Sequence, residues 1–299
     1  MDQGQALRGE DILFAANDGL ALYARDIRPA AETTLCPVIC LPGLSRNGRD
    51  FDGIARMIAT APKGARRVIL PDSRGRGRSA RDPDPTHYTV GQELADLVRL
   101  MEVLSLRRAV FIGTSRGGIL LHLLASQAPD TIAACVLNDI GPVIETGGLL
   151  AIRDALKPGR TFIDFAAAAE ALRVRYGRQF PGLSEADWAE MARAIHTEQD
   201  GVVVPDFDPA IMAPFATLTA ETVLPSAWPN YEALARKPVL VVRGALSDIL
   251  SEETASEMVR RGEGRARLVT VPGQGHVPLL HTEPAASAIL SFLATNAID

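Results

Sequence analysis

The sequence of 299 residues has few cysteines, no excess of positive charge and no long hydrophobic run, and each shortage excludes a class of protein. Its three cysteines are an odd set, and Cys40 and Cys135 lie in apolar runs, so we expect neither a disulfide framework nor a metal site. A formal net charge of −5 argues against nucleic-acid binding, which needs a basic surface. No apolar run reaches membrane-spanning length, and the start of the chain lacks the basic and apolar regions of a signal peptide. We therefore expect a cytoplasmic protein that does not bind membranes.

What the sequence has instead is an alternation of apolar, strand-like runs with helical segments. A hairpin around residues 17–19 opens the chain, because Asn-Asp-Gly is a strong tight-turn signal. Such alternation predicts an α/β fold with a mostly parallel sheet covered by helices on both faces. The strands after the hairpin are expected at residues 37–41, 67–70, 109–112, 132–137, 238–243 and 266–271, and the helices at residues 50–59, 90–104, from 119, 251–261 and 284–296.

The alternation stops between residues 143 and 236. Segments 162–176 and 185–196 have helical composition, and a tract that contains five prolines between residues 205 and 229 follows them. We interpret residues 143–236 as an inserted, mostly helical lid that lies over the carboxyl edge of the sheet. Residues 1–142 and 237–299 would then form the core domain.

The segment Gly113-Thr114-Ser115-Arg116-Gly117 lies between an apolar strand and an apolar helix. Gly-x-Ser-x-Gly is a weak signal alone, but a strand that reverses sharply into a helix is the context in which its serine acts as a nucleophile. The glycines are needed because a Cβ at either position would collide in so tight a turn. Ser115 at the apex would have the helix N-terminus behind it, which stabilises a developing negative charge.

Two further polar residues follow strands on the same expected sheet edge. Asp248 comes after strand 238–243 and His276 after strand 266–271. A serine hydroxyl needs a base within hydrogen-bond reach, and that base needs an acceptor that fixes its tautomer. We therefore predict Ser115 as nucleophile, His276 as base and Asp248 as the acid. Asp139, which follows strand 132–137, is the alternative acid.

Backbone N–H groups for a tetrahedral oxyanion are expected from two residues. Leu44 lies in the glycine-bearing loop after strand 37–41, and Arg116 directly follows the serine. For the loop that contains Leu44, the alternative is a plain turn from strand to helix with no role in catalysis.

A second glycine pattern, Gly75-x-Gly77-x-x-Ala80, imitates a dinucleotide-binding loop. No helix begins there and no acidic residue ends a second strand at the required distance, so we expect no bound cofactor. The neighbouring arginines are expected to be solvated or paired with Asp72, Asp82 and Asp84.

We do not predict a catalytic role for the remaining four histidines. His122 is expected in the core, His281 is expected to pack near the last helix, and His87 and His196 are expected at the surface.

Taken in order, these motifs resemble those of α/β-hydrolase-fold enzymes, and among them the lid-bearing serine esterases, enol-lactonases and carbon–carbon bond hydrolases. The resemblance implies a mostly parallel eight-stranded sheet with helices on both faces, an inserted lid and no cofactor. Two positions depart from the family: Pro42 replaces a common histidine, and Arg116 replaces a common methionine or leucine. The matching segments are Pro42-Gly43-Leu44, residues 72–79 (Asp-Ser-Arg-Gly-Arg-Gly-Arg-Ser), residues 113–117, residues 243–248 and Gly275-His276.

The predicted activity is hydrolysis of a carboxylic ester or related small acyl compound through an acyl-enzyme. The alternatives are a carbon–carbon bond hydrolase or enol-lactonase of aromatic-compound degradation, and a non-enzymatic receptor or scaffold of the same fold. The oligomeric state is left open, with a homodimer among the alternatives. A substrate carboxylate could be received by arginines of the lid, which are Arg153, Arg160, Arg173, Arg175 and Arg178.

Overall fold

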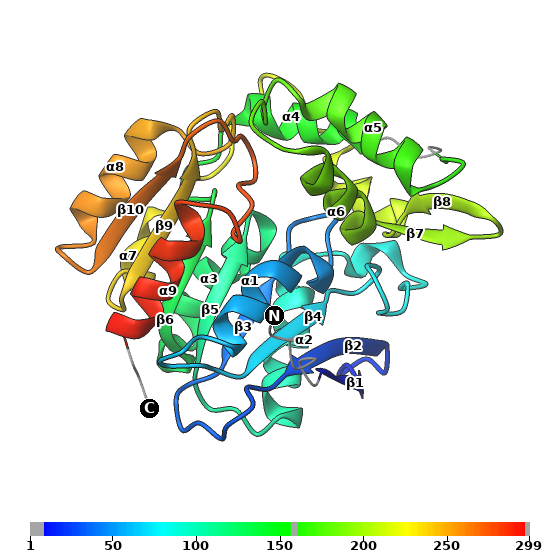
Figure 1. Ribbon diagram of the computed structural model, residues 1–299. Helices are drawn as coiled ribbons and strands as arrows, with labels where there is room; N and C mark the ends of the chain where they lie inside the picture. The colour runs from blue at the N-terminus through cyan, green and yellow to red at the C-terminus, as the bar shows by residue number, and fades with distance from the viewer. Residues whose placement is uncertain (1–8, 157–160, 297–299) are drawn as a thin grey trace.

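The computed structural model describes residues 9–156 and 161–296 of the chain (Figure 1). Within these residues, eight strands form one sheet in the order β1-β2-β4-β3-β5-β6-β9-β10. Strand β2 pairs antiparallel with β1 and β4, and the other pairings are parallel, so the predicted sheet is confirmed. The strands are β1 (Gly9–Ala15), β2 (Ala21–Ile27), β3 (Val38–Leu41), β4 (Val68–Asp72), β5 (Ala109–Thr114), β6 (Ile132–Asn138), β9 (Val239–Gly244) and β10 (Ala266–Val271).

Helices cover both faces of this sheet (Figure 1). The central strands are buried along their whole length, and their successive side chains enter two separate hydrophobic cores. Phe111 and Leu137 pack with α2, α3 and α8, whereas Ile112 and Val136 pack with α1 and α9 on the other face. These helices are α1 (Asp52–Ala59), α2 (Val90–Val103), α3 (Arg116–Gln127), α8 (Glu252–Arg261) and α9 (Ala285–Thr295).

Residues 143–236, here called the inserted segment, leave the sheet after β6 and return at β9. Its helices α5 and α6 pack around a small core of their own that includes Leu172, Trp188 and Val203. In Figure 1 the helices α4, α5 and α6 and the hairpin β7–β8 lie together beyond one edge of the sheet. The elements are α4 (Thr146–Ala155), α5 (Phe165–Tyr176), α6 (Glu185–Ile195), β7 (His196–Gln199), β8 (Val202–Pro205), η4 (Pro209–Phe215) and α7 (Trp228–Leu234).

Two features of the inserted segment add to the expectation of a mostly helical lid. Strands β7 and β8 form an antiparallel hairpin whose turn residues Asp200 and Gly201 both have positive φ. Helix α7 packs against α3, and its Tyr231 and Leu234 belong to the sheet core. The predicted division assigns residues 143–236 to the lid, and it stays a prediction. Helix α7 falls inside these bounds but packs on the core of the sheet.

Polar contacts hold the inserted segment against the core loops. The side-chain amide of Asn47 donates to the carbonyl of Ala194 at 3.0 Å. Arg49 pairs with Asp206 at 2.6 Å, and the Tyr88 hydroxyl donates to the Asp208 carboxylate at 2.6 Å. In the described parts of the chain no helix has the length and hydrophobicity needed to cross a membrane.

Candidate active site

Ser115 lies at a sharp turn between β5 and α3, as predicted. Its backbone has φ 50° and ψ −112°, a conformation rare for a residue with a side chain, and its N–H donates to the carbonyl of Asn138 at 3.0 Å. A Cβ at Gly117 would come within 2.2 Å of the Leu41 carbonyl oxygen, and one at Gly113 within 2.7 Å of the Gly118 nitrogen. The strained turn is therefore possible because Gly113 and Gly117 lack a side chain.

His276 lies beyond the end of β10 and connects Ser115 to a carboxylate. Its Nε2 is 3.0 Å from Ser115 Oγ, and its Nδ1 is 2.8 Å from Asp139 Oδ2. A carboxylate only accepts hydrogen bonds, so Nδ1 carries the proton that faces Asp139. Nε2 of the neutral ring is then free to accept the proton of the serine hydroxyl.

Asp139 is the carboxylate at His276, which corrects the prediction of Asp248. Asp139 directly follows β6, has φ 55° and is fully buried. Its Oδ1 accepts the N–H of Gly244 at 2.8 Å, and its Oδ2 accepts the hydroxyl of Ser247 at 2.5 Å. These contacts fix the carboxylate toward the imidazole.

Asp248 lies elsewhere because the chain turns before reaching it. The N–H of Ser247 donates to the carbonyl of Gly244 at 3.0 Å, which closes a turn directly after β9. The Asp248 carboxylate instead accepts the side-chain amide of Gln179, at 3.2 Å, and lines a cavity above Ser115. The position of Asp248 at the edge of the sheet was predicted, but its partner is Gln179 and not the predicted His276.

The predicted oxyanion donors are the backbone N–H groups of Leu44 and Arg116. Leu44 lines the same cavity as Ser115 and His276. Arg116 is the first residue of α3, where the N–H groups have no acceptor inside the helix. Within residues 9–156 and 161–296 neither N–H has a hydrogen-bond acceptor. Both N–H groups are thus free to donate a hydrogen bond.

The side chain of Arg116 points away from the cavity into a buried ion-pair network. Its Nε donates to Glu93 Oε2 at 2.7 Å, and Arg76 Nη1 donates to Glu93 Oε1 at 2.9 Å. Arg76 Nε also donates to the carbonyl of Leu44 at 2.8 Å. Burial alone would raise the pKa of Glu93, but the two guanidinium groups offset burial and lower it. Glu93 thereby connects Arg116 to Arg76 and, through Arg76, to the carbonyl of Leu44, a link that the sequence did not reveal.

The cavity above Ser115 has a volume of about 440 Å³, and we call it the inner compartment. Core loops supply one wall, and helices α4, α5 and α6 of the inserted segment supply the other. Arg175 and Arg178 are the arginines of the expected lid that line it, among the described residues. Arg153 instead pairs with Asp154, Arg173 pairs with Glu170, and Arg160 lies outside the described residues.

Comparison with known proteins identifies the family of the chain. The sequence model of the alpha/beta hydrolase family matches residues 38–288. The chain belongs to the alpha/beta hydrolase family. It is 34% identical over 273 residues to the 3-hydroxybutyrate-oligomer hydrolase of Cupriavidus necator, covering 87% of this chain and 88% of that one.

Solved structures show the same relationship. An alpha/beta hydrolase from Novosphingobium aromaticivorans superposes with a TM-score of 0.89 at 39% identity, covering 97% of this chain and 99% of that one. The structure of E-2-(acetamidomethylene)succinate hydrolase gives a TM-score of 0.75 at 25% identity, with 95% and 99% of the two chains covered. The protein is therefore a hydrolase with the predicted fold.

Replacing Glu93 by Gln should lower kcat of this hydrolase with little change in KM. The amide cannot neutralise two buried guanidinium groups, so Arg76 would no longer hold Leu44 in place. We expect kcat for p-nitrophenyl butyrate to fall about 10–100-fold, less than the loss expected from removing a whole oxyanion donor.

The control for this variant is Glu102→Gln, which removes an exposed carboxylate from the same helix and should leave kcat unchanged. Thermal unfolding of both variants shows whether the fold survives. A folded Glu93→Gln enzyme with wild-type kcat would contradict the prediction.

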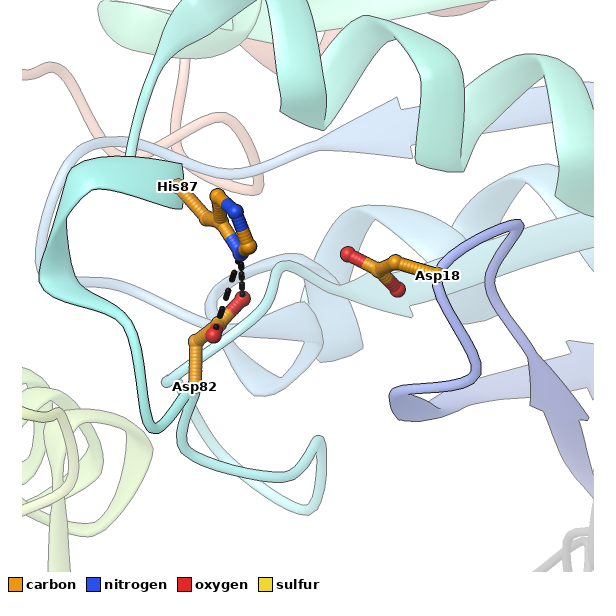
Figure 2. A group of neighbouring side chains, drawn as sticks. All are labelled: Asp18, Asp82 and His87. Carbon is orange, nitrogen blue, oxygen red and sulfur yellow. Dashed lines mark hydrogen bonds and ion pairs between the residues drawn. The ribbon is translucent and has the colours of Figure 1, made fainter.

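One group of side chains has the composition of a metal site. Asp18, Asp82 and His87 offer ligand atoms that lie within 4.8 Å of one another, and Figure 2 shows the His87 imidazole bonded to Asp82. However, Nη1 of Arg74 donates to both carboxylates, and its Nη2 pairs with Asp96 at 2.7 Å. The carboxylates of the cluster thus already share a guanidinium partner, and ion pairing explains why they lie together.

The loop that imitates a dinucleotide site instead connects the core to the inserted segment. The carbonyl of Gly75 accepts the N–H of Asp208 at 2.7 Å, and the N–H of Gly77 donates to the carbonyl of Asp206 at 3.1 Å. Arg74 and Arg76 in this loop are buried rather than solvated. Asp72, an expected ion-pair partner, accepts backbone N–H groups from Gly48 and Arg78 instead.

The remaining histidines are structural in different ways. His122 is buried in the core as expected, where burial lowers its pKa to about 4. His281 packs against Gly53 at the start of α1, and His87 stays partly exposed. His196 was expected at the surface, but it is buried beside Phe162 with Nδ1 bonded to the Ala192 carbonyl.

Proposed function

We propose that this hydrolase cleaves carboxylic esters through an acyl-enzyme formed on Ser115. The observation that carries the proposal is the hydrogen-bonded series from the Ser115 hydroxyl through the His276 imidazole to the Asp139 carboxylate. A serine nucleophile requires this combination of base and orienting acid. The free N–H groups of Leu44 and Arg116 supply the matching donors for the oxyanion.

Acylation begins when His276 Nε2 takes the proton of Ser115 as Oγ attacks the ester carbonyl. The carbonyl oxygen becomes negative and accepts the N–H groups of Leu44 and Arg116, each worth about 2.7–4 kcal/mol in the transition state. The C–O bond to the alcohol then breaks, and His276 gives its proton to the departing alkoxide. Asp139 stays ionised and stabilises the imidazolium form of His276 throughout.

Deacylation repeats these steps with water. His276 removes a proton from the water molecule, whose oxygen attacks the acyl carbon bound to Ser115. The intermediate collapses, and His276 returns the proton to Ser115 Oγ. The carboxylic acid leaves the inner compartment, and the enzyme is restored.

We propose esters of short hydroxy acids as the substrate class. The relative from Cupriavidus necator is named for 3-hydroxybutyrate oligomers and aligns over most of both chains. The apolar residues Ala151, Ile152, Leu156 and Met191 of the inner compartment suit small aliphatic acyl groups. We place the reaction in the cytoplasm, a location supported by three buried free thiols.

The test is a burst experiment with p-nitrophenyl butyrate and purified wild-type enzyme. We expect a rapid release of p-nitrophenol that matches the enzyme concentration, followed by slower turnover. Mass spectrometry should find the butyryl group on the peptide that contains Ser115. An enzyme that cleaves enol-lactones or ring-cleavage diketones and leaves all esters intact would contradict the proposal.

A further inference from the structure

A second cavity of about 260 Å³ adjoins the inner compartment, and we call it the outer compartment. The mechanism above does not use it. The two compartments share part of their walls and are therefore adjacent. The residues that line both are Ser45, Ala155, Leu156, Arg175 and Tyr176.

The outer compartment combines an apolar wall with positive charge. Phe162, Leu172 and Phe207 supply apolar surface, and Arg81 and Arg175 supply two guanidinium groups. Among the described residues that line this compartment there is no aspartate or glutamate. His196 also lines it, but burial lowers the pKa of that imidazole and keeps it neutral near pH 7.

The two arginines differ from Arg74 and Arg76 of the core, whose buried guanidinium groups pair with carboxylates. Arg175 donates from Nη2 to the backbone carbonyl of Asp154 at 3.0 Å, and its guanidinium lies 5.7 Å from the centre of the Tyr176 ring. These neutral partners fix the guanidinium without cancelling its charge. Within residues 9–156 and 161–296, neither Arg81 nor Arg175 is paired with a carboxylate.

We propose that the outer compartment binds the free carboxylate of a linear ester substrate through Arg175, with Arg81 as a second contact. This inference rests on the proposed ester hydrolysis at Ser115. A guanidinium presents several N–H donors in a plane and therefore suits a carboxylate at a fixed distance from the scissile bond.

The chemistry of hydroxy-acid oligomers fits this placement. When Ser115 attacks an ester bond of such an oligomer, the departing alcohol carries the free carboxylate at its far end. A carboxylate held in the outer compartment places the chain so that an ester bond reaches Ser115. The hydrolase should therefore prefer oligomers that end in a carboxylate over neutral oligomers of equal length.

The test compares the linear trimer of 3-hydroxybutyrate with the same trimer ending in a primary carboxamide. We expect the wild type to prefer the acid by about tenfold or more, and Arg175→Gln to lower kcat/KM for the acid about 10–100-fold. The preference of this variant for the acid over the carboxamide should fall toward one, because the neutral carboxamide forms no ion pair with the guanidinium. Arg81→Gln should lower only the value for the acid, by a smaller factor.

Two further variants control for structure. Arg173→Gln lies on the same helix, loses only its exposed pair with Glu170, and should behave as wild type. Arg175→Lys keeps the positive charge and should recover part of the preference for the acid. If Arg175→Gln does not fold, Arg81→Gln and the loss of acid preference at high salt decide the question.

Equal kcat/KM for acid and carboxamide in the wild type would overturn the carboxylate site. An equal loss for both substrates in folded Arg175→Gln would overturn it as well. Neither result affects the proposed ester hydrolysis, which fails only if the wild type hydrolyses no ester.

Discussion

Replacing Asp139 by Asn should lower kcat for ester hydrolysis about 10⁴-fold while the fold is retained. The asparagine amide has the size of the carboxylate but cannot stabilise a positive imidazolium. It also favours the wrong tautomer, because its NH₂ group donates where the carboxylate accepted the Nδ1 proton of His276. The measurement is kcat with p-nitrophenyl butyrate, together with thermal unfolding.

Asp248→Asn is the matched control for this prediction. Asp248 also follows a strand on the same edge and lines the inner compartment, but its contact is the amide of Gln179 and not His276. We expect its kcat to stay within about fivefold of wild type, since no part of the proton transfer is lost. Were Asp248→Asn the inactive enzyme and Asp139→Asn the active one, the carboxylate assigned here would be wrong.

The sequence sufficed for the features that depend on local pattern. The sheet was predictable because each buried strand is a short apolar run, and β-strand and helical periods differ. The turn at Ser115 was predictable because Gly-x-Ser-x-Gly between a strand and a helix is typical of a sharp turn with an exposed serine. His276 was found since it follows the last strand directly.

The choice between Asp139 and Asp248 could not be made from local sequence. Both residues follow parallel strands, so both were placed at the edge near His276. The outcome depends on the positive φ of Asp139 and on the turn closed by Ser247, which direct one carboxylate toward the imidazole and the other away from it. Such orientations follow from packing between β6 and β9.

Other differences have different causes. The hairpin β7–β8 had a readable signal, because Asp200-Gly201 before three valines is typical of a tight turn between strands. No sequence signal indicated the role of Glu93. A glutamate on a helix is usually exposed, and the two arginines that pair with Glu93 belong to other segments of the chain. Long-range ion pairs of this kind become visible only when the helix and both loops are in place.

Replacing Ser115 by Ala should lower kcat about 10⁶-fold and abolish the burst of p-nitrophenol. The substitution removes the hydroxyl group that acts as the nucleophile. The N–H groups of Leu44 and Arg116 and the arginines of the outer compartment remain, so we expect the variant to bind the trimer. Calorimetry of trimer binding and mass spectrometry of the protein after exposure to ester measure the two effects separately. Retained acylation in Ser115→Ala would place the covalent intermediate on another residue. Retained turnover without acylation would mean that His276 activates water directly, and that the series from Ser115 to Asp139 serves a different mechanism.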